Sequence, residues 1–316
     1  MKWNYLFIVL AIGVLSSCYE EDTLTPTEGT EEIFKLPQGD HDYDTRIVKW
    51  FEHYGFYGLY IFDEKDIYWA NQDWLEGGKP EVSTSGTEKG KTGDPEYVGY
   101  LVDMFEKLFL NHYPEQFIQK GMPLRVFLCS SLWNYTYDRV LGEYISTRIW
   151  MYEGWDNIAV NGASSYIVSM TRQDQLDFSH SLNAYLLQRI VTEKLVTIPD
   201  EFYAESSYDK TSFSGADLFE NGYLEQAEYS IRNGVTKDEY KAFDLQTYVT
   251  LVAYSLDYLE NGELEDISYE ATPSLSGLFK RPEATKVKKK YDIVVKAFRN
   301  AGIDMEKIQI PLVVEY

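Results

Sequence analysis

The sequence contains few of the residues that build metal centres. Four histidines are present among its 316 residues. They are His41, His53, His112 and His180. Because a catalytic zinc ion usually takes three protein ligands, often histidines, this composition disfavours a histidine-rich zinc centre.

Cysteine is scarcer still, since Cys18 and Cys129 are the two examples. Cys129 follows the apolar residues 126–128, a setting that predicts a small buried core residue rather than a nucleophile. Cys18 lies where a lipid anchor is expected, as described below. Lipidation of Cys18 would leave Cys129 alone, so it would exclude an intrachain disulfide.

Positive charge is also in short supply. Lysine and arginine number 29 against 51 aspartates and glutamates, which gives a formal net charge of −22. Nucleic acids and anionic membrane surfaces require a basic face, so both are disfavoured as partners. The lysines at positions 286 and 288–290 lie among Val287, Ile293 and Val294, which predicts an amphipathic helix with a solvated basic face.

The apolar run of residues 6–15 is too short to span a bilayer. It follows Lys2 and precedes small residues, as in a secretory signal. The sequence Leu15-Ser16-Ser17-Cys18 resembles a bacterial lipobox, which predicts a signal peptide in residues 1–17 and a lipid on Cys18. Cleavage removes one lysine and leaves 28 − 51 = −23. The alternative is a short N-terminal membrane anchor without a lipid.

The residues after Cys18 predict an anchored protein on the cell surface. The acidic residues 20–22 resemble signals that send lipoproteins of some Gram-negative bacteria to the outer face of the outer membrane. Residues 18–43 are rich in Thr, Glu, Gly and Pro, which favours a flexible tether. Residues 44–316 are then expected to form a single globular domain.

Hydrophobic periodicity predicts an α+β domain with a mostly helical C-terminal half. Helices are expected in residues 44–55, 95–109, 171–191, 223–233, 236–259 and 283–301. A hairpin is expected in residues 57–69, and buried strands in 124–130 and 157–160. Residues 76–95 predict a long loop, either disordered or a lid, and 133–137 and 145–150 predict further loops. Neither a phosphate-binding loop nor a GxSxG motif is present.

The helix at residues 171–191 holds the most suggestive chemistry. Thr171 is a predicted N-cap, with Asp174 three residues later. The segment from Leu176 to His180 has the length of the zinc motif HExxH, in which two histidines bind the metal and the glutamate activates water. Here Leu176 replaces the first histidine, and Asp177 is one methylene shorter than glutamate. Three interpretations stay open: a semi-buried His180 paired with Asp177, a retained metal site, and a ligand pocket without metal.

The mature chain resembles the substrate-import-associated zinc metallohydrolase lipoproteins, also described as zinc-binding metallopeptidases. The resemblance rests on residues 177–180, in the place of that family's HEFxH, and on residues 282–306, which are similar to its Lys-rich closing helix. It implies a gluzincin-type zincin fold, with a small mixed sheet beside the motif helix. A later family segment, EDFAEYV, corresponds to residues 243–249. Asp244 matches there, but Phe243 and Thr247 replace both glutamates.

These departures lead to three hypotheses. The first is a lipoprotein with a decayed metal site, no catalytic residue and no cofactor, whose cleft binds a glycan or peptide; the 27 tyrosines and 7 tryptophans suit such ligands. The resemblance implies an import setting, with a TonB-dependent channel and its binding lipoprotein as partners. The second is an active metal-dependent hydrolase or peptidase that assembles zinc from His180, Asp177 and Asp244. The third is a structural envelope protein without a ligand.

Overall fold

The computed structural model describes residues 34–63, 66–67, 89–209, 216–225, 236–265 and 273–316. Leu36–Tyr316 forms one compact unit. Residues 36–43, the predicted end of the tether, belong to this unit because the Gln38 side chain accepts hydrogen bonds from the backbone of Tyr60 (2.7 Å) and Ile61 (3.0 Å). The predicted signal peptide and Cys18 lie outside the described residues.

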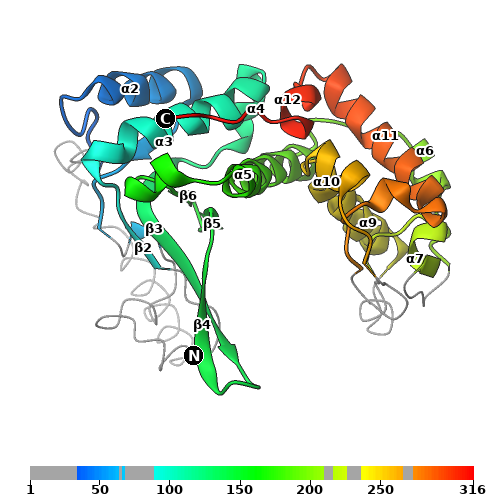
Figure 1. Ribbon diagram of the computed structural model, residues 1–316. Helices are drawn as coiled ribbons and strands as arrows, with labels where there is room; N and C mark the ends of the chain where they lie inside the picture. Colours follow the sequence, from blue (N-terminus) through cyan, green and yellow to red (C-terminus); the bar gives the residue numbers. More distant parts are fainter. Residues whose placement is uncertain (1–33, 64–65, 68–88, 210–215, 226–235, 266–272) are drawn as a thin grey trace, which may run out of the picture. The chain divides into compact units, whose positions relative to one another are not determined.

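A six-stranded mixed sheet is built around strand β3 (Arg125–Asp138). Its first half pairs in parallel with β1 (Tyr57–Leu59) and β6 (Asn157–Asn161). Its second half pairs antiparallel with β2 (Lys89–Thr92) and β4 (Glu143–Arg148), and β5 (Met151–Glu153) pairs antiparallel with β6. Strands β3 and β4 form a twisted ribbon that leaves the other strands (Figure 1).

Several predicted elements of this region are wrong. Residues 57–59 of the predicted hairpin form a strand that pairs in parallel with β3, whereas residues 64–65 and 68–69 of that hairpin lie outside the described part of the chain. Residues 133–137 and 145–148 are strand rather than loop, and residues 89–92 of the predicted long loop are strand β2; residues 76–88 lie outside the described part. Pairing between residues distant in sequence decides these elements, and local periodicity does not report it.

Helices α2 (Asp42–Tyr54), α3 (Pro95–Leu108) and α4 (Glu115–Gly121) pack beside the sheet, with short 3₁₀ turns at Leu110–His112 (η4) and Ser165–Ser169 (η5). Both predicted N-terminal helices are confirmed. Asp94 caps α3 by accepting from Glu96 N at 3.1 Å, directly before Pro95. Tyr43, Ile47 and Trp50 are buried side chains of α2, and Ile47 contacts the strand residue Gly58.

The central helix is α5 (Arg172–Thr192), close to the predicted limits. Thr171 and Asp174 form a complete capping box, as expected. The helix contacts α4, β5, α9 and α12, so it joins the sheet to the helical C-terminal half. Asn183 is fully buried, and its side chain donates to the carbonyl of Leu108 at 3.1 Å.

The C-terminal half is helical, as predicted. Its helices are α6 (Glu201–Ala204), α7 (Ala216–Glu220), α9 (Lys237–Leu251), α10 (Leu256–Asn261), α11 (Thr285–Asn300) and α12 (Met305–Gln309), with 3₁₀ turns at Leu278–Lys280 and Pro282–Ala284. The single helix predicted for residues 236–259 is two helices, because Ser255 caps α10 by accepting from Tyr258 N at 3.3 Å. Most of the predicted helix at 223–233 lies outside the described residues.

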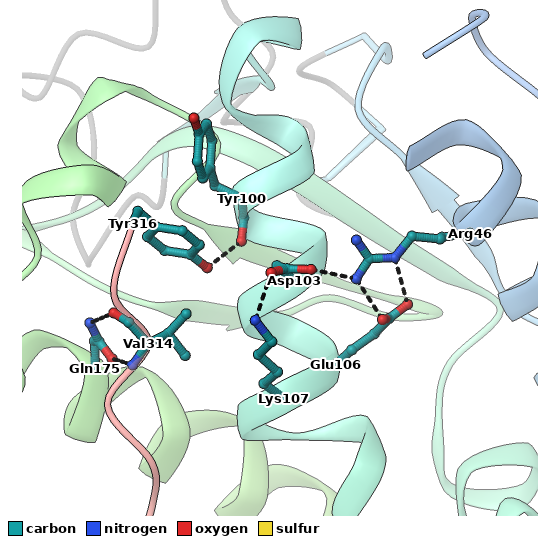
Figure 2. Close-up of polar contacts among 8 residues, drawn as sticks. All are labelled: Arg46, Tyr100, Asp103, Glu106, Lys107, Gln175, Val314 and Tyr316. Atoms are coloured by element: carbon teal, nitrogen blue, oxygen red, sulfur yellow. Dashed lines mark hydrogen bonds and ion pairs between the residues drawn. The ribbon is translucent and has the colours of Figure 1, made fainter. Parts of the chain in front are cut away.

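The last residues lie across α5 and α3 (Figure 2). Gln175 donates to the carbonyl of Val314 at 2.9 Å and accepts from its backbone N at 2.8 Å. The Tyr316 hydroxyl donates to the carbonyl of Tyr100 at 2.7 Å. These contacts tie an extended segment without helix or strand to two long helices.

The described part of the chain is thus a mixed α/β protein with a mixed sheet and a helical C-terminal half. Within that part, no helix is both long and apolar enough to cross a membrane. Cys129 is completely buried in β3, which confirms its predicted place in the core.

Candidate functional site

His180 lies on α5 and stacks on Tyr254, with ring centroids 3.8 Å apart and an angle of 24° between the planes. Its Nδ1 atom is buried and has no hydrogen-bond partner in the described part of the chain. Burial disfavours the charged ring and lowers the pKa of His180 to about 4, although the backbone of Ala253 opposes this shift. The imidazole is therefore neutral at pH 7.

The predicted pairing of His180 with Asp177 is wrong. Asp177 is exposed and accepts a hydrogen bond from Gln173 at 2.8 Å, one turn earlier. Partial desolvation raises the pKa of the Asp177 carboxyl, against the effect of the Gln173 hydrogen bond. Aromatic stacking thus takes the place of the expected ion pair.

Asp244, the third candidate ligand, is buried on α9 and points to a different partner. Its carboxylate lies 2.6 Å from the Nζ of Lys290, a fully buried lysine of α11. Lys290 also donates to the carbonyl of Gly222 at 2.8 Å and to the Ser206 hydroxyl at 2.9 Å. Burial lowers the pKa of Lys290 to about 8 in spite of the opposing Asp244 charge.

Aromatic rings surround this ion pair. The Nζ of Lys290 lies 4.4 Å from the ring centroid of Phe202, 4.5 Å from that of Tyr248 and 5.3 Å from that of Tyr223. The faces of such rings attract cations, so they offset part of the desolvation of the ammonium. The prediction that all four lysines of residues 286–290 lie on a solvated face is wrong for Lys290.

These residues do not fit a zinc ion. Zinc needs several nitrogen, sulfur or oxygen donors that converge on one point. Among the described residues, no group of three His, Cys, Asp or Glu side chains is placed to hold a metal. Asp177 faces solvent and Asp244 is held by Lys290, so neither joins the stacked ring of His180 in a ligand set.

Two clefts flank the stacked rings instead. The first has a volume of about 510 Å³ and is lined by residues of α5, of α10 and of the turn before α10. Its lining is mostly polar: Arg172, Gln173, Leu176, Ser255, Asp257, Tyr258, Asn261 and Gly262. Asp257 accepts from the Asn261 amide at 3.0 Å and lies 3.6 Å from the Arg172 guanidinium.

The second cleft has a volume of about 300 Å³ and lies between α5 and α9. Amide and hydroxyl side chains dominate its wall, among them Gln188, Gln246, Thr247 and Thr250. Gln188 donates to the Thr250 hydroxyl at 3.0 Å. Tyr254 closes the wall on the side of the stacked rings.

Two stacked aromatic rings lie between the two clefts. Tyr254 lines the second cleft and Tyr258 lines the first, and their centroids lie 5.1 Å apart in a stacked arrangement. His180 stacks on the other side of this pair through Tyr254. We refer to His180, Tyr254 and Tyr258 as the ring stack. Both clefts combine an aromatic wall with polar donors and acceptors, and the two charged groups of the first cleft, Arg172 and Asp257, face each other at 3.6 Å. Such a lining suits binding of a polar ligand rich in hydroxyl groups.

Sequence reasoning missed Tyr254, Tyr258 and Lys290. The spacing of Val287, Lys290 and Val294 would have placed Lys290 on the buried face of α11, but the preference of lysine for solvent outweighed that signal. Tyr254 and Tyr258 fall in a segment that was predicted as one continuous helix, so the turn that brings Tyr254 onto His180 was not predicted.

Neither a protein-family model nor a curated protein sequence matches this chain. A solved structure described as a "putative zinc-binding metallo-peptidase" from Bacteroides caccae is similar at 12% sequence identity and a TM-score of 0.36. The similarity covers 66% of this chain and 72% of the other. A TM-score below 0.5 does not establish a shared fold, so the mixed α/β architecture rests on this chain's own elements.

Proposed function

We propose that this chain is a carbohydrate-binding lipoprotein of the bacterial outer membrane, anchored through Cys18, with a zincin-like fold and no functional metal site. It would serve a nutrient-import system as an accessory beside a TonB-dependent channel and its binding lipoprotein. The observation that carries the binding proposal is the ring stack, which separates two polar clefts.

The chemistry of the clefts favours sugars. A pyranose presents apolar C–H faces, which pack on aromatic rings, and a rim of hydroxyls that both donate and accept hydrogen bonds. Tyr258 supplies a ring to the first cleft, while Arg172, Gln173, Asp257 and Asn261 supply donors and acceptors. The volume of about 510 Å³ lies within the usual range for small-ligand sites.

A peptide ligand is favoured less by the same lining. Extended peptides bind through an open sheet edge or an apolar groove with pockets for side chains. Among the described residues that line the first cleft, Leu176 is the one aliphatic side chain, and the wall comes from helices and turns. Peptide binding is therefore the second candidate for the same site.

Binding can be tested by calorimetric titration of the purified domain with maltoheptaose, cellohexaose, xylohexaose and mannohexaose. Saturable binding of at least one sugar is expected, and Tyr258→Ala should weaken it about tenfold through loss of ring packing. Trp155→Ala removes an aromatic side chain that is 77% exposed and lines neither cleft, so it is the matched control. If no sugar binds, the proposal fails; a response to unstructured peptides alone would replace sugar by peptide.

Whether the protein binds zinc through His180 can be tested separately. The hydrolase hypothesis requires a ligand set that includes His180, but this ring is stacked on Tyr254. Elemental analysis of protein purified without chelators should give no stoichiometric zinc. Zinc at one equivalent that disappears in His180→Ala would overturn the decayed-site proposal and favour the hydrolase.

The anchor is tested by replacing Cys18 with serine. Loss of the thiol should prevent lipid attachment and release the protein from the membrane fraction, since one or more acyl chains supply the membrane affinity. Protease treatment of intact cells should degrade the unaltered protein if it lies on the outer face. Membrane association that persists in Cys18→Ser would support the unlipidated N-terminal anchor instead.

A further inference from the structure

A third cleft lies on the opposite, N-terminal part of the fold, between α2 and the end of α3. It has a volume of about 320 Å³. Arg46, Lys49 and His53 line it from α2 at a spacing of three and four residues, so they lie on one helix face. This cluster of cationic and imidazole side chains is unusual in a chain with a net charge of −22.

Glu106, the one acid among the described residues of the cleft wall, already has partners. Its carboxylate accepts from Arg46 Nη2 at 2.6 Å and from the Trp50 indole at 2.9 Å. Asp103, one turn earlier on α3, accepts from Lys107 at 2.8 Å and lies 2.9 Å from Arg46 Nη2. Partial burial works against ionisation of Asp103, but the hydrogen bonds from Lys107 and Arg46 lower its pKa.

These acids fix the orientation of Arg46. Figure 2 shows its guanidinium turned toward Glu106 and Asp103, with Nε and Nη2 in the contacts. A guanidinium has five N–H donors in a rigid fork. Within the described residues, no hydrogen bond engages Nη1, so part of this fork is available to a ligand.

The other polar groups of the cleft are also donors without partners. In the part of the chain that the structure describes, neither the Lys49 ammonium nor the side chains of His53, Tyr54 and Asn111 form a hydrogen bond. Lys49, His53 and Asn111 are exposed, and Tyr54 is half-buried. Four side chains without hydrogen-bond partners and the Nη1 group of Arg46 therefore line this cleft, whose described carboxylate, Glu106, already accepts from Arg46 and Trp50.

We propose that this cleft binds an oxyanion group, a carboxylate or phosphate carried by a small organic ligand, through the donors of Arg46, Lys49 and His53. Charge-assisted hydrogen bonds to such groups are the strongest that neutral or cationic donors make. The volume of about 320 Å³ leaves room for a body of about the size of a monosaccharide beyond the anionic group. This site shares no residue with the two clefts beside the ring stack, so the anion-binding proposal can be tested independently of the carbohydrate proposal.

The test is a titration at pH 7 and constant ionic strength with glucuronate, glucose and inorganic phosphate. Chemical shifts of the Asn111 side-chain amide and calorimetry report binding. Saturable binding of glucuronate or phosphate is expected, with no shift of the Asn111 amide on addition of glucose, which matches glucuronate except for the carboxylate. Binding by glucuronate alone would assign the site to acidic sugars, and binding by phosphate to phosphorylated ligands.

A pair of variants locates the site. Lys49→Gln combined with His53→Gln should weaken anion binding about tenfold, because charged hydrogen bonds are lost. Lys296→Gln removes an exposed lysine of α11 that does not line this cleft, and it should bind as the unaltered protein does. The proposal is overturned if neither anion saturates, or if the double variant and Lys296→Gln bind equally well.

Discussion

The ammonium of Lys290 lies 2.6 Å from the carboxylate of Asp244, and both side chains are buried. The pair joins α11 to α9, and Lys290 also reaches the loop residues Ser206 and Gly222. One buried cation thus holds together four segments of the C-terminal half, in the place where the sequence suggested a metal ligand.

Removal of Lys290 should destabilise the domain strongly. Lys290→Met leaves the buried Asp244 carboxyl with the Tyr208 hydroxyl but without its cationic partner, so we expect the free energy of unfolding to fall by about 3–5 kcal/mol. Adding Asp244→Asn to this variant should recover part of the loss, because the unpaired charge is then absent. Urea denaturation followed by circular dichroism measures both.

Lys289→Met is the control for that experiment. Lys289 is the adjacent lysine, 62% exposed and paired with Glu205, and a surface pair of this kind contributes at most about 1 kcal/mol. Equal effects of Lys289→Met and Lys290→Met would contradict the assigned role of Lys290.

Replacement of His180 should change how stability depends on pH. Its folded pKa of about 4 lies below the ordinary value of 6.5, so the unfolded chain binds the proton more readily. The stability linked to His180 is complete above pH 6.5 and is lost as the pH falls toward 4. The loss approaches about 3 kcal/mol, from the size of the shift.

His180→Phe keeps a ring on Tyr254 and removes the titrating group and the unpaired Nδ1. Its free energy of unfolding, measured by urea denaturation from pH 4 to 8, should fall less steeply below pH 6.5 than that of the unaltered protein. Parallel curves for His180→Phe and the unaltered protein would show that His180 does not titrate in this way.

The Gln175 side chain should contribute substantially to the stability of the domain. Gln175→Ala leaves the buried N–H and carbonyl of Val314 without partners, so the free energy of unfolding should fall by about 2–3 kcal/mol. Gln173→Ala, two residues earlier at an exposed position, should change it by less than about 0.5 kcal/mol. Thermal and chemical denaturation provide the comparison, and similar losses at both positions would refute the role given to the Gln175 contact.

The Cys129 thiol should be inert in the native protein. It is completely buried in the centre of the sheet, where neither reagent nor hydroxide can reach it. In a Cys18→Ser background, a disulfide reagent should label Cys129 only as fast as the domain unfolds. Val140→Cys, at a position that is 93% exposed, provides the fast reference, and labelling of Cys129 at that rate would be incompatible with the structure.

The parts of the fold that local signals determine could be predicted. Thr171 with Asp174 marked the start of α5, and Pro95 marked that of α3, because capping depends on a few adjacent residues. The parallel pairing of β1 with β3 could not be predicted in this way. The paired residues Tyr57 and Arg125 lie 68 residues apart, and no local sequence pattern indicates which strands pair.

The candidate site was predicted in part. The sequence singled out His180 and Asp244, but it named neither of the partners that the structure gives them, Tyr254 and Lys290. Tyr254 reaches His180 only because the chain turns between α9 and α10, and Lys290 is buried only because aromatic rings and three acceptors surround it. Both effects arise from tertiary contacts, which spacing along the chain does not encode.

The two halves of strand β3 pair with different strands. This difference determines where residues can be inserted or deleted without disturbing the rest of the sheet. From Asn134 to Asp138, its described backbone pairs with β4 alone, whereas residues 125–127 are fixed on both sides by β1 and β6. Facing residues could be added to or removed from the ribbon in matched numbers without altering the parallel register of the core. An epitope inserted at its turn would therefore be a suitable label for detecting the intact protein on living cells.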